Sequence, residues 1–285
     1  MYPDIELMNL AAIYIIRGAG FARDFTPKLL IAFITIGMVL WDWRRQRRLD
    51  YLWVFVCGSL LWAAAEALLT LQGIRDMPVR SLFGQPLSLT LSWVIQGMSE
   101  GAFVAVVGLF VGDRILNRST RISGLIAGVV VLGTIALATF RSRRFLLALE
   151  PASRRNLLDS RALLALAVLS LLVIVFYVIR KRWRQRTLMM FGFMVCLGTV
   201  WSSTQVAVGG RWVEIDSAGY GYEQAGSLIT FSALAFDVVV EIALVYVSFL
   251  AIPVLLGLLR QPLPLPVAPI EIAKSRLTQR FEDLN

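Results

Sequence analysis

Seven apolar runs of about twenty residues, separated by short charged connections, are the feature that most constrains this chain. Their bounds are 26–43, 51–71, 89–112, 122–140, 162–179, 188–208 and 229–258. A helix needs about twenty apolar residues to cross a hydrocarbon layer of ~30 Å, and only helices and closed barrels satisfy every backbone polar group there. The sequence therefore predicts an all-α integral membrane protein, a bundle of seven transmembrane helices.

Composition and missing residue types narrow the functional classes. The chain is 58% hydrophobic and 16% charged, whereas soluble domains are roughly 45–50% apolar and about 25% charged. It contains no histidine and only two cysteines, both inside apolar runs, which excludes the haem and zinc sites that need those ligands. A phosphate-binding glycine loop and a nucleophile elbow are also absent. We therefore expect no cofactor, no metal site and no catalytic residue set.

Basic residues in the connections predict the orientation of the bundle. Lys and Arg are more numerous after the first, third and fifth runs and in the tail than in the other connections. The positive-inside rule then places the N-terminus outside and the C-terminus inside. The strong preference for arginine over lysine is typical of a GC-rich bacterial genome, so we expect a multi-pass protein of a bacterial inner (plasma) membrane.

The chain divides into three parts on this basis. Residues 1–25 form an outer segment, in which 5–16, apolar but too short to span, is predicted to be a short helix lying in the interface. Residues 26–259 form the transmembrane domain. Residues 260–285 begin with a proline-rich spacer. Apolar residues at helical spacing over 270–284 then predict a short amphipathic helix, either interfacial, docked on a partner protein, or the start of a coiled coil.

The connection 141–161 is unusually basic for its predicted outer side. Its arginines include Arg141, Arg143, Arg144, Arg154 and Arg155. Apolar residues between them give an amphipathic pattern, which favours an interfacial helix whose arginines contact the phosphates of anionic lipids. A docking surface for an acidic partner protein is the alternative. Lipid headgroups, rather than nucleic acid, also explain the net charge of +9.

Four acidic residues that lie away from the ends of the runs are the most informative feature for function: Glu66, Glu100, Asp237 and Glu241. A charge at membrane depth is costly, so such residues usually face the bundle interior and mark a functional site. None of the runs contains an interior Lys or Arg to pair with them. Unpaired and dry, the four carboxylates could not all stay ionised, so water, protonation or a bound cation is required. In the predicted orientation all four lie at middle to outer depth, where they could line one cavity.

Aromatic and polar residues follow the same helix faces. These neighbours are Trp62, Trp93, Gln96, Trp201, Thr204 and Gln205. Carboxylates and tryptophan rings together suit an organic cation, through charge neutralisation and cation–π contact. The simpler interpretation is that tryptophans near the ends of runs are interface anchors, and that Glu66 and Asp237 are merely hydrated near the outer surface.

Three functions remain open at this point. The favoured one is a membrane protein with an outward-open, carboxylate- and tryptophan-lined cavity that binds or transports a small cation or protons. The second is a sensor or an accessory subunit of a larger membrane complex, which docks partners through its basic loops and its C-terminal helix. A lipid-modifying enzyme with paired carboxylates as acid and base ranks last, since no nucleophile or metal set accompanies them.

Overall fold

The computed structural model describes residues 12–16, 23–47, 49–77, 80–142, 153–156, 159–217 and 221–259. Within these ranges, seven helices are long and apolar enough to cross a membrane. Each of them overlaps one predicted apolar run, so the predicted number and order of the long apolar helices are confirmed. This architecture fits a multi-pass membrane protein.

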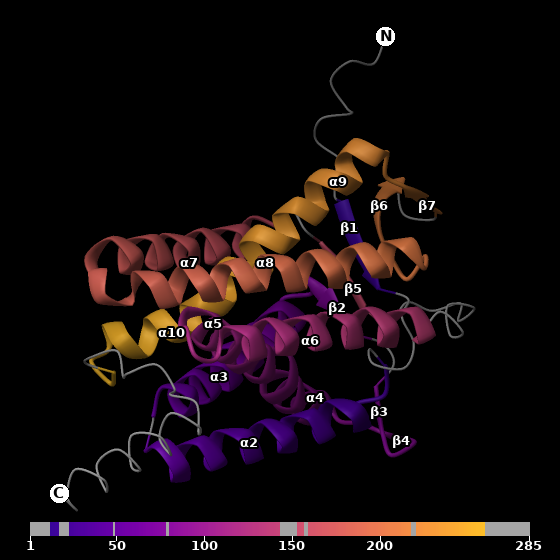
Figure 1. The fold of residues 1–285 in the computed structure, drawn as a ribbon. Coiled ribbons are helices and arrows are strands. Elements are labelled where there is room, and N and C mark those ends of the chain that lie inside the picture. The colour runs from indigo at the N-terminus through magenta and orange to yellow at the C-terminus, as the bar shows by residue number, and fades with distance from the viewer. Residues whose placement is uncertain are drawn as a thin grey trace, which may run out of the picture.

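The seven spans run in chain order through the helices labelled in Figure 1. The first two are α2 (Thr26–Gln46) and α3 (Asp50–Leu71). The third is continuous through α4 (Leu89–Gln96), η1 (Gly97–Phe103) and α5 (Val104–Leu116). The next three are α6 (Arg121–Ser142), α7 (Ser160–Ile179), and η3 (Lys181–Trp183) with α8 (Arg184–Ala207). The seventh runs through α9 (Ser227–Phe236), η4 (Asp237–Leu244) and α10 (Val245–Leu255).

The third and the seventh span each contain a π-helical segment. The first of these segments, η1, carries Glu100, and the second, η4, carries Asp237 and Glu241. A π-helical turn is rare, and it occurs frequently at functional sites. Three of the four acids singled out in the sequence therefore lie where the helix is locally irregular.

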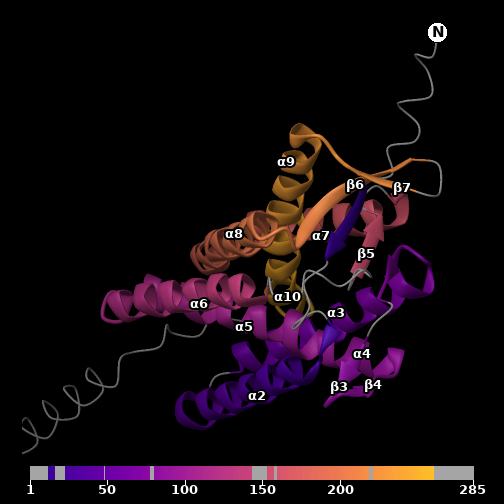
Figure 2. The same ribbon diagram turned by 90° about the vertical axis from the view of Figure 1, so that its right-hand side faces the viewer.

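A five-stranded antiparallel sheet, which the sequence analysis does not predict, lies at one end of the bundle (Figure 2). Its strands are β1 (Ala12–Ile16), β2 (Arg75–Asp76), β5 (Ser153–Asn156), β6 (Arg211–Ser217) and β7 (Gly221–Gln224). Their order across the sheet is β2-β5-β1-β6-β7. β2 and β6 follow the ends of α3 and α8, and β5 and β7 precede α7 and α9. We call this end of the bundle the sheet end, and the opposite end the far end.

A separate two-stranded hairpin lies next to the beginning of α2. It consists of β3 (Ser81–Leu82) and β4 (Gln85–Pro86). The backbone N–H of Phe25 donates to the carbonyl oxygen of Ser81 at 2.8 Å, and Phe25 packs with Leu87 and Ile95 in a small apolar cluster. The hairpin thereby fixes the first turn of α2, which carries one of the site residues described below.

Two predictions for the termini meet different outcomes. The short interfacial helix predicted over 5–16 is wrong for its last five residues, because Ala12–Ile16 forms the central strand β1 between β5 and β6. Isoleucine and tyrosine favour strands when partner strands are present on both sides, and those partners lie far away in the sequence. Residues 5–11 and the predicted helix over 270–284 lie outside the described residues.

The main apolar core lies between α3, α5, α8 and α10, and includes the fully buried Leu109 and Met194. Near the middle of α3, this helix and η1 approach each other backbone to backbone. A Cβ atom added to Gly58 would lie 3.0 Å from the Cα of Ala102, and one added to Gly101 would contact the Trp62 side chain. Small residues allow this close packing of helices in a membrane. It sets the position of Glu100 relative to α3.

Candidate functional site

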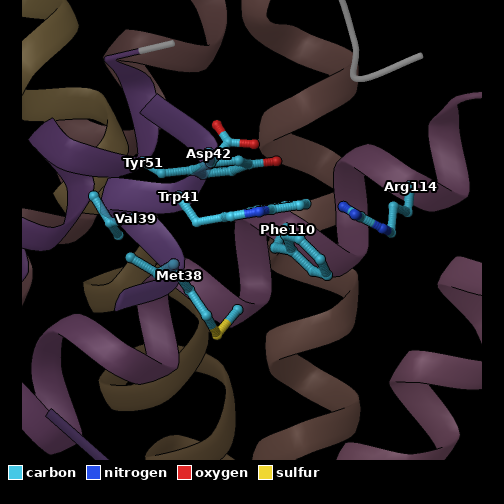
Figure 3. A pocket seen from close by; sticks show the side chains of 8 residues that line it. Met38, Val39, Trp41, Asp42, Tyr51, Phe110 and Arg114 are labelled. Carbon is cyan, nitrogen blue, oxygen red and sulfur yellow. The ribbon is translucent and has the colours of Figure 1, made fainter. Parts of the chain in front are cut away.

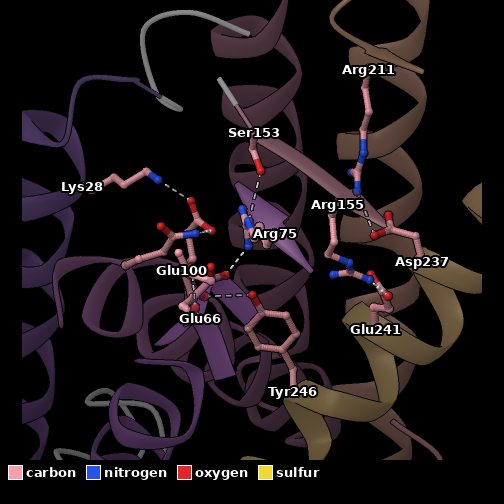
Figure 4. Close-up of polar contacts among 12 residues, drawn as sticks. Lys28, Glu66, Arg75, Glu100, Ser153, Arg155, Arg211, Asp237, Glu241 and Tyr246 are labelled. Atoms are coloured by element: carbon pink, nitrogen blue, oxygen red, sulfur yellow. Dashed lines mark hydrogen bonds and ion pairs between the residues drawn. The ribbon is translucent and has the colours of Figure 1, made fainter. Parts of the chain in front are cut away.

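The four acids singled out in the sequence lie between the middle of the bundle and the sheet end, and Figure 4 shows them with their polar contacts. Glu66 on α3 is 2% exposed, and Asp237 and Glu241 on η4 are 3% and 7% exposed. The Glu100 side chain on η1 is 18% exposed. All four side chains are therefore largely shielded, and each needs a counter-charge or a set of hydrogen-bond donors.

Every one of these acids has a basic partner. The Lys28 ammonium lies 2.7 Å from a Glu100 carboxylate oxygen. The other three pairs are Arg75 with Glu66, Arg155 with Glu241, and Arg211 with Asp237 at 2.8 Å (Figure 4). The premise that the acids lack basic partners is therefore wrong. The bases come from the beginning of α2 and from the connections between spans, and not from the interior of any span.

Three of the four bases belong to the sheet. Arg75 lies on β2, Arg155 on β5 and Arg211 on β6. Each of them reaches from its strand to a carboxylate on a helix. We call these three ion pairs the cap pairs, and the five-stranded sheet the cap. The cap pairs tie the sheet to α3 and η4.

Arg75 and Arg155 lie side by side in the β2–β5 ladder. Like charges directly opposite each other destabilise a strand pair, so this arrangement depends on the two carboxylates below. Burial, together with the positive charge of Arg75, lowers the pKa of Arg155 to about 10. The Nε of Arg75 also donates to the Ser153 hydroxyl at 3.0 Å, which orients its guanidinium toward Glu66.

Arg211 is the centre of a second polar cluster, formed with α8 and η4. Its guanidinium donates to Asp237 at 2.8 Å and to the Ser202 hydroxyl at 3.0 Å, with a longer contact to Gln205 at 3.4 Å. The Ser202 hydroxyl in turn donates to the second carboxylate oxygen of Asp237 at 2.9 Å. Both oxygens of Asp237 are therefore satisfied by protein groups.

Glu100 is held by groups from three elements. Lys28 of α2 is paired with one carboxylate oxygen, and Gln96 donates to the other at 3.1 Å. The Tyr246 hydroxyl of α10 donates to the Glu100 backbone carbonyl at 3.0 Å, and the Tyr246 ring stacks on Trp62 with centroids 5.2 Å apart. Lys28, near the beginning of α2, is only 2% exposed and is part of the site.

Several buried polar atoms at the sheet end have no hydrogen-bond partner among the described residues. The acceptors are Glu66 Oε2 and Gln96 Oε1, and the donors are Trp62 Nε1, Trp93 Nε1 and Arg155 Nε. Leaving such an atom buried and unpaired costs about 1–3 kcal/mol, and more for a charged group. These atoms offer a bound polar molecule, ion or water both acceptors and donors.

The remaining predicted residues lie partly in this site and partly elsewhere. Gln96 and Gln205 contribute hydrogen bonds to it. Trp201 packs against the apolar core, and the Thr204 hydroxyl donates to carbonyls of its own helix. The structure adds Lys28, Arg75, Arg211 and Ser202 to the site, none of which the sequence analysis assigns to it. Among the described residues, no group of three or more His, Cys, Asp or Glu side chains could hold a metal ion.

The arginines predicted to contact lipids or a partner protein have different positions. Arg155 is directed to Glu241 and is a site residue. Arg141 lies exposed near the end of α6. The backbone of Arg154 belongs to β5. Arg143 and Arg144 lie outside the described residues.

Comparison with protein-family models, with curated proteins and with solved structures gives no match for this chain. Its residues and their geometry alone therefore carry the functional conclusion.

Proposed function

We propose that this chain is a multi-pass protein of a bacterial inner membrane that binds, or passes across the membrane, a small cation or protons at its sheet end. In the predicted orientation, with the N-terminus outside, the sheet end faces outward. The cap then covers the four acids from the outer side. The site is closed by its own bases in the arrangement described above, rather than being an open cavity.

The observation that carries this proposal is the pairing of each acid with a base from a different element. A proton or a cation that reaches one of these carboxylates takes over the role of its base. The displaced arginine then loses its counter-charge, and because three of the bases are on the cap, the cap loses an attachment to the helices. Buried ion pairs usually stabilise a protein less than apolar packing at the same place. Their presence here supports the proposal that the contact between the cap and the helices is made and broken.

Glu66 is the carboxylate best suited to accept the first proton or cation. One of its oxygens is paired with Arg75, whereas Oε2 is buried and has no partner among the described residues. The Trp62 ring lies one helical turn earlier on α3, and an aromatic face adds attraction for an organic cation. One Glu66 oxygen is thus paired with Arg75, and the other can accept a proton or a cation.

Proton uptake into vesicles tests this proposal. The protein is reconstituted into liposomes that contain a pH-sensitive dye, and a potassium gradient with valinomycin supplies the driving potential. We expect uptake above that of empty vesicles, and its loss in Glu66→Gln. The matched control is Asp159→Asn, which neutralises an acid in the loop before α7. If neither proton uptake nor flux of tetramethylammonium exceeds that of empty vesicles, the proposal is overturned.

A further inference from the structure

A cavity of about 250 Å³ lies toward the far end, between α2, α3 and α5 (Figure 3). Its wall includes Trp41 and Asp42 from α2, Tyr51 from α3, and Phe110 and Arg114 from α5. None of these residues belongs to the site at the sheet end. The cavity is therefore a separate feature of the molecule, with its own chemistry.

The wall combines a carboxylate, aromatic rings and a guanidinium. The Tyr51 and Phe110 rings form a tilted pair with centroids 6.1 Å apart. Figure 3 shows the Trp41 ring close to both, with Asp42 on one side and Arg114 next to Phe110. The Arg114 guanidinium carbon lies 3.5 Å from the centroid of the Phe110 ring. A carboxylate with ring faces recognises an ammonium group, and a guanidinium recognises a phosphate. The two sides of the cavity therefore suit a molecule that carries both groups.

The position of the cavity matches that of lipid headgroups. Trp41 and Asp42 lie in the last turn of the first span, which ends at Arg44. Trp41 is 51% exposed, and its neighbours Leu40 and Trp43 are exposed as well. Tryptophans at the end of a span lie at the level of the headgroups. The volume is below the roughly 300–1,000 Å³ of pockets for drug-sized ligands, as suits a headgroup whose acyl chains remain outside.

A buried polar network holds one wall of the cavity in place. The Tyr51 hydroxyl donates to Asp113 at 2.9 Å. Arg186 of α8 binds Asp113 through two hydrogen bonds of 2.7 and 2.6 Å and also binds Asp50 at 2.5 Å. This network joins α3, α5 and α8 beneath the cavity, so the Tyr51 ring is fixed before any ligand arrives. A preformed wall lowers the entropy cost of binding.

We propose that this cavity binds the headgroup of a zwitterionic phospholipid with a primary amine, of the phosphatidylethanolamine type. A primary ammonium donates charge-assisted hydrogen bonds to a carboxylate such as Asp42, whereas a trimethylammonium group has no N–H to donate. The ammonium group contacts Asp42 and the aromatic rings, and the phosphate contacts Arg114. The acyl chains lie along the exposed apolar surface of α2. A lipid bound in this way connects α2 to the network of Tyr51, Asp113 and Arg186, and it stabilises the far end.

Native mass spectrometry of the purified protein tests this proposal. Three lipids with identical acyl chains are added in turn: phosphatidylethanolamine, phosphatidylglycerol and phosphatidylcholine. We expect phosphatidylethanolamine to bind tightest, and its affinity to fall about tenfold in Asp42→Asn and in Arg114→Gln, since each substitution removes one charge-assisted contact. Arg118→Gln, an exposed arginine one turn beyond Arg114, is the matched control and keeps the wild-type affinity.

Three results would overturn the proposal. They are equal binding of the three lipids, tighter binding of phosphatidylglycerol, and unchanged affinity in both variants. Binding of soluble glycerophosphoethanolamine is measured in the same way. If it binds as tightly as the whole lipid, the membrane lipid is not the ligand. Circular dichroism checks the fold of each variant. If a variant does not fold, the order of the affinities of the three lipids for the wild-type protein is the test of the proposal.

Discussion

Arg75 and Arg155 are direct neighbours across the β2–β5 ladder, yet their side chains are paired with carboxylates on two different helices, Glu66 on α3 and Glu241 on η4. The two-residue ladder therefore connects the second span to the seventh. Neutralising either carboxylate leaves its guanidinium without a counter-charge. That guanidinium then repels its neighbour across the ladder more strongly, so the other ion pair is affected as well. This coupling underlies the predictions for the cap.

Breaking the pair between Glu66 and Arg75 is expected to destabilise the protein strongly. Glu66→Gln leaves the Arg75 guanidinium shielded without an anion, which costs about 3–5 kcal/mol for a buried pair. The double variant Glu66→Gln with Arg75→Met removes both charges and should regain most of that loss. Unfolding in detergent, followed by circular dichroism against urea, gives the three free energies of unfolding. A double variant no more stable than Glu66→Gln would show that the two residues do not act as a pair.

Ser202 is predicted to matter for stability, whereas its neighbour Ser203 is not. The Ser202 hydroxyl donates to Asp237 and accepts from Arg211, so Ser202→Ala leaves two charged groups short of a partner. We expect a loss of about 1–3 kcal/mol in the free energy of unfolding. Ser203 is exposed and its hydroxyl donates only to the Thr199 carbonyl of its own helix in the described structure. Equal losses of unfolding free energy in Ser202→Ala and Ser203→Ala would contradict the role of Ser202 in the cluster with Asp237 and Arg211.

The close approach of α3 and η1 predicts a difference between two glycine substitutions. A Cβ atom at Gly101 would run into the Gly58 carbonyl and the Trp62 side chain, whereas one at Gly133 of α6 meets nothing within 4 Å. Overpacking costs about 1–3 kcal/mol, so Gly101→Ala should lower the unfolding temperature and Gly133→Ala should not. The same unfolding temperature in both variants would mean that the backbones are not in contact.

The stability of the first turn of α7 is expected to depend on pH through Asp159. It caps the N-terminus of α7, and hydrogen bonds from the Arg161 side chain lower its pKa from the ordinary value. A lowered pKa in the folded state means that the stabilising contribution is present above the ordinary pKa of Asp and is lost as the pH falls through the lowered value. Amides in the first turn of α7 should therefore lose protection from hydrogen exchange in acid. Asp159→Asn should show no such dependence, after correction for the intrinsic exchange rates.

The helices and the acids could be predicted from sequence because each depends on local information. A long apolar run predicts a span without reference to any other segment, and Glu66 or Glu100 is recognisable as a charge within such a run. The contact of Gln96 with Glu100 also follows from their spacing of four residues on one helix face. These features need no knowledge of how the spans are arranged.

The bases and the cap could not be predicted in the same way, because they depend on contacts between distant segments. Arg155 and Glu241 are 86 residues apart, and β1 finds its partners in the connections before α7 and after α8. Strands this short carry little pattern of their own. Arg75 is the exception: it lies nine residues from Glu66, and Gly73 with φ of 69° lets the chain turn at the end of α3. A search of the residues just beyond each run would have found it.

Hydrogen exchange of β5 tests most directly the claim that the cap pairs hold the sheet on the bundle. Glu241→Gln mimics a protonated carboxyl and removes the counter-charge of Arg155, so we predict faster exchange of the Ser153–Asn156 amides than in the wild type at the same pH. Asp50→Asn neutralises a buried acid at the far end, paired with Arg186, and should leave β5 unchanged. Exchange of β5 as slow in Glu241→Gln as in the wild type would contradict a cap that is released when its acids are neutralised.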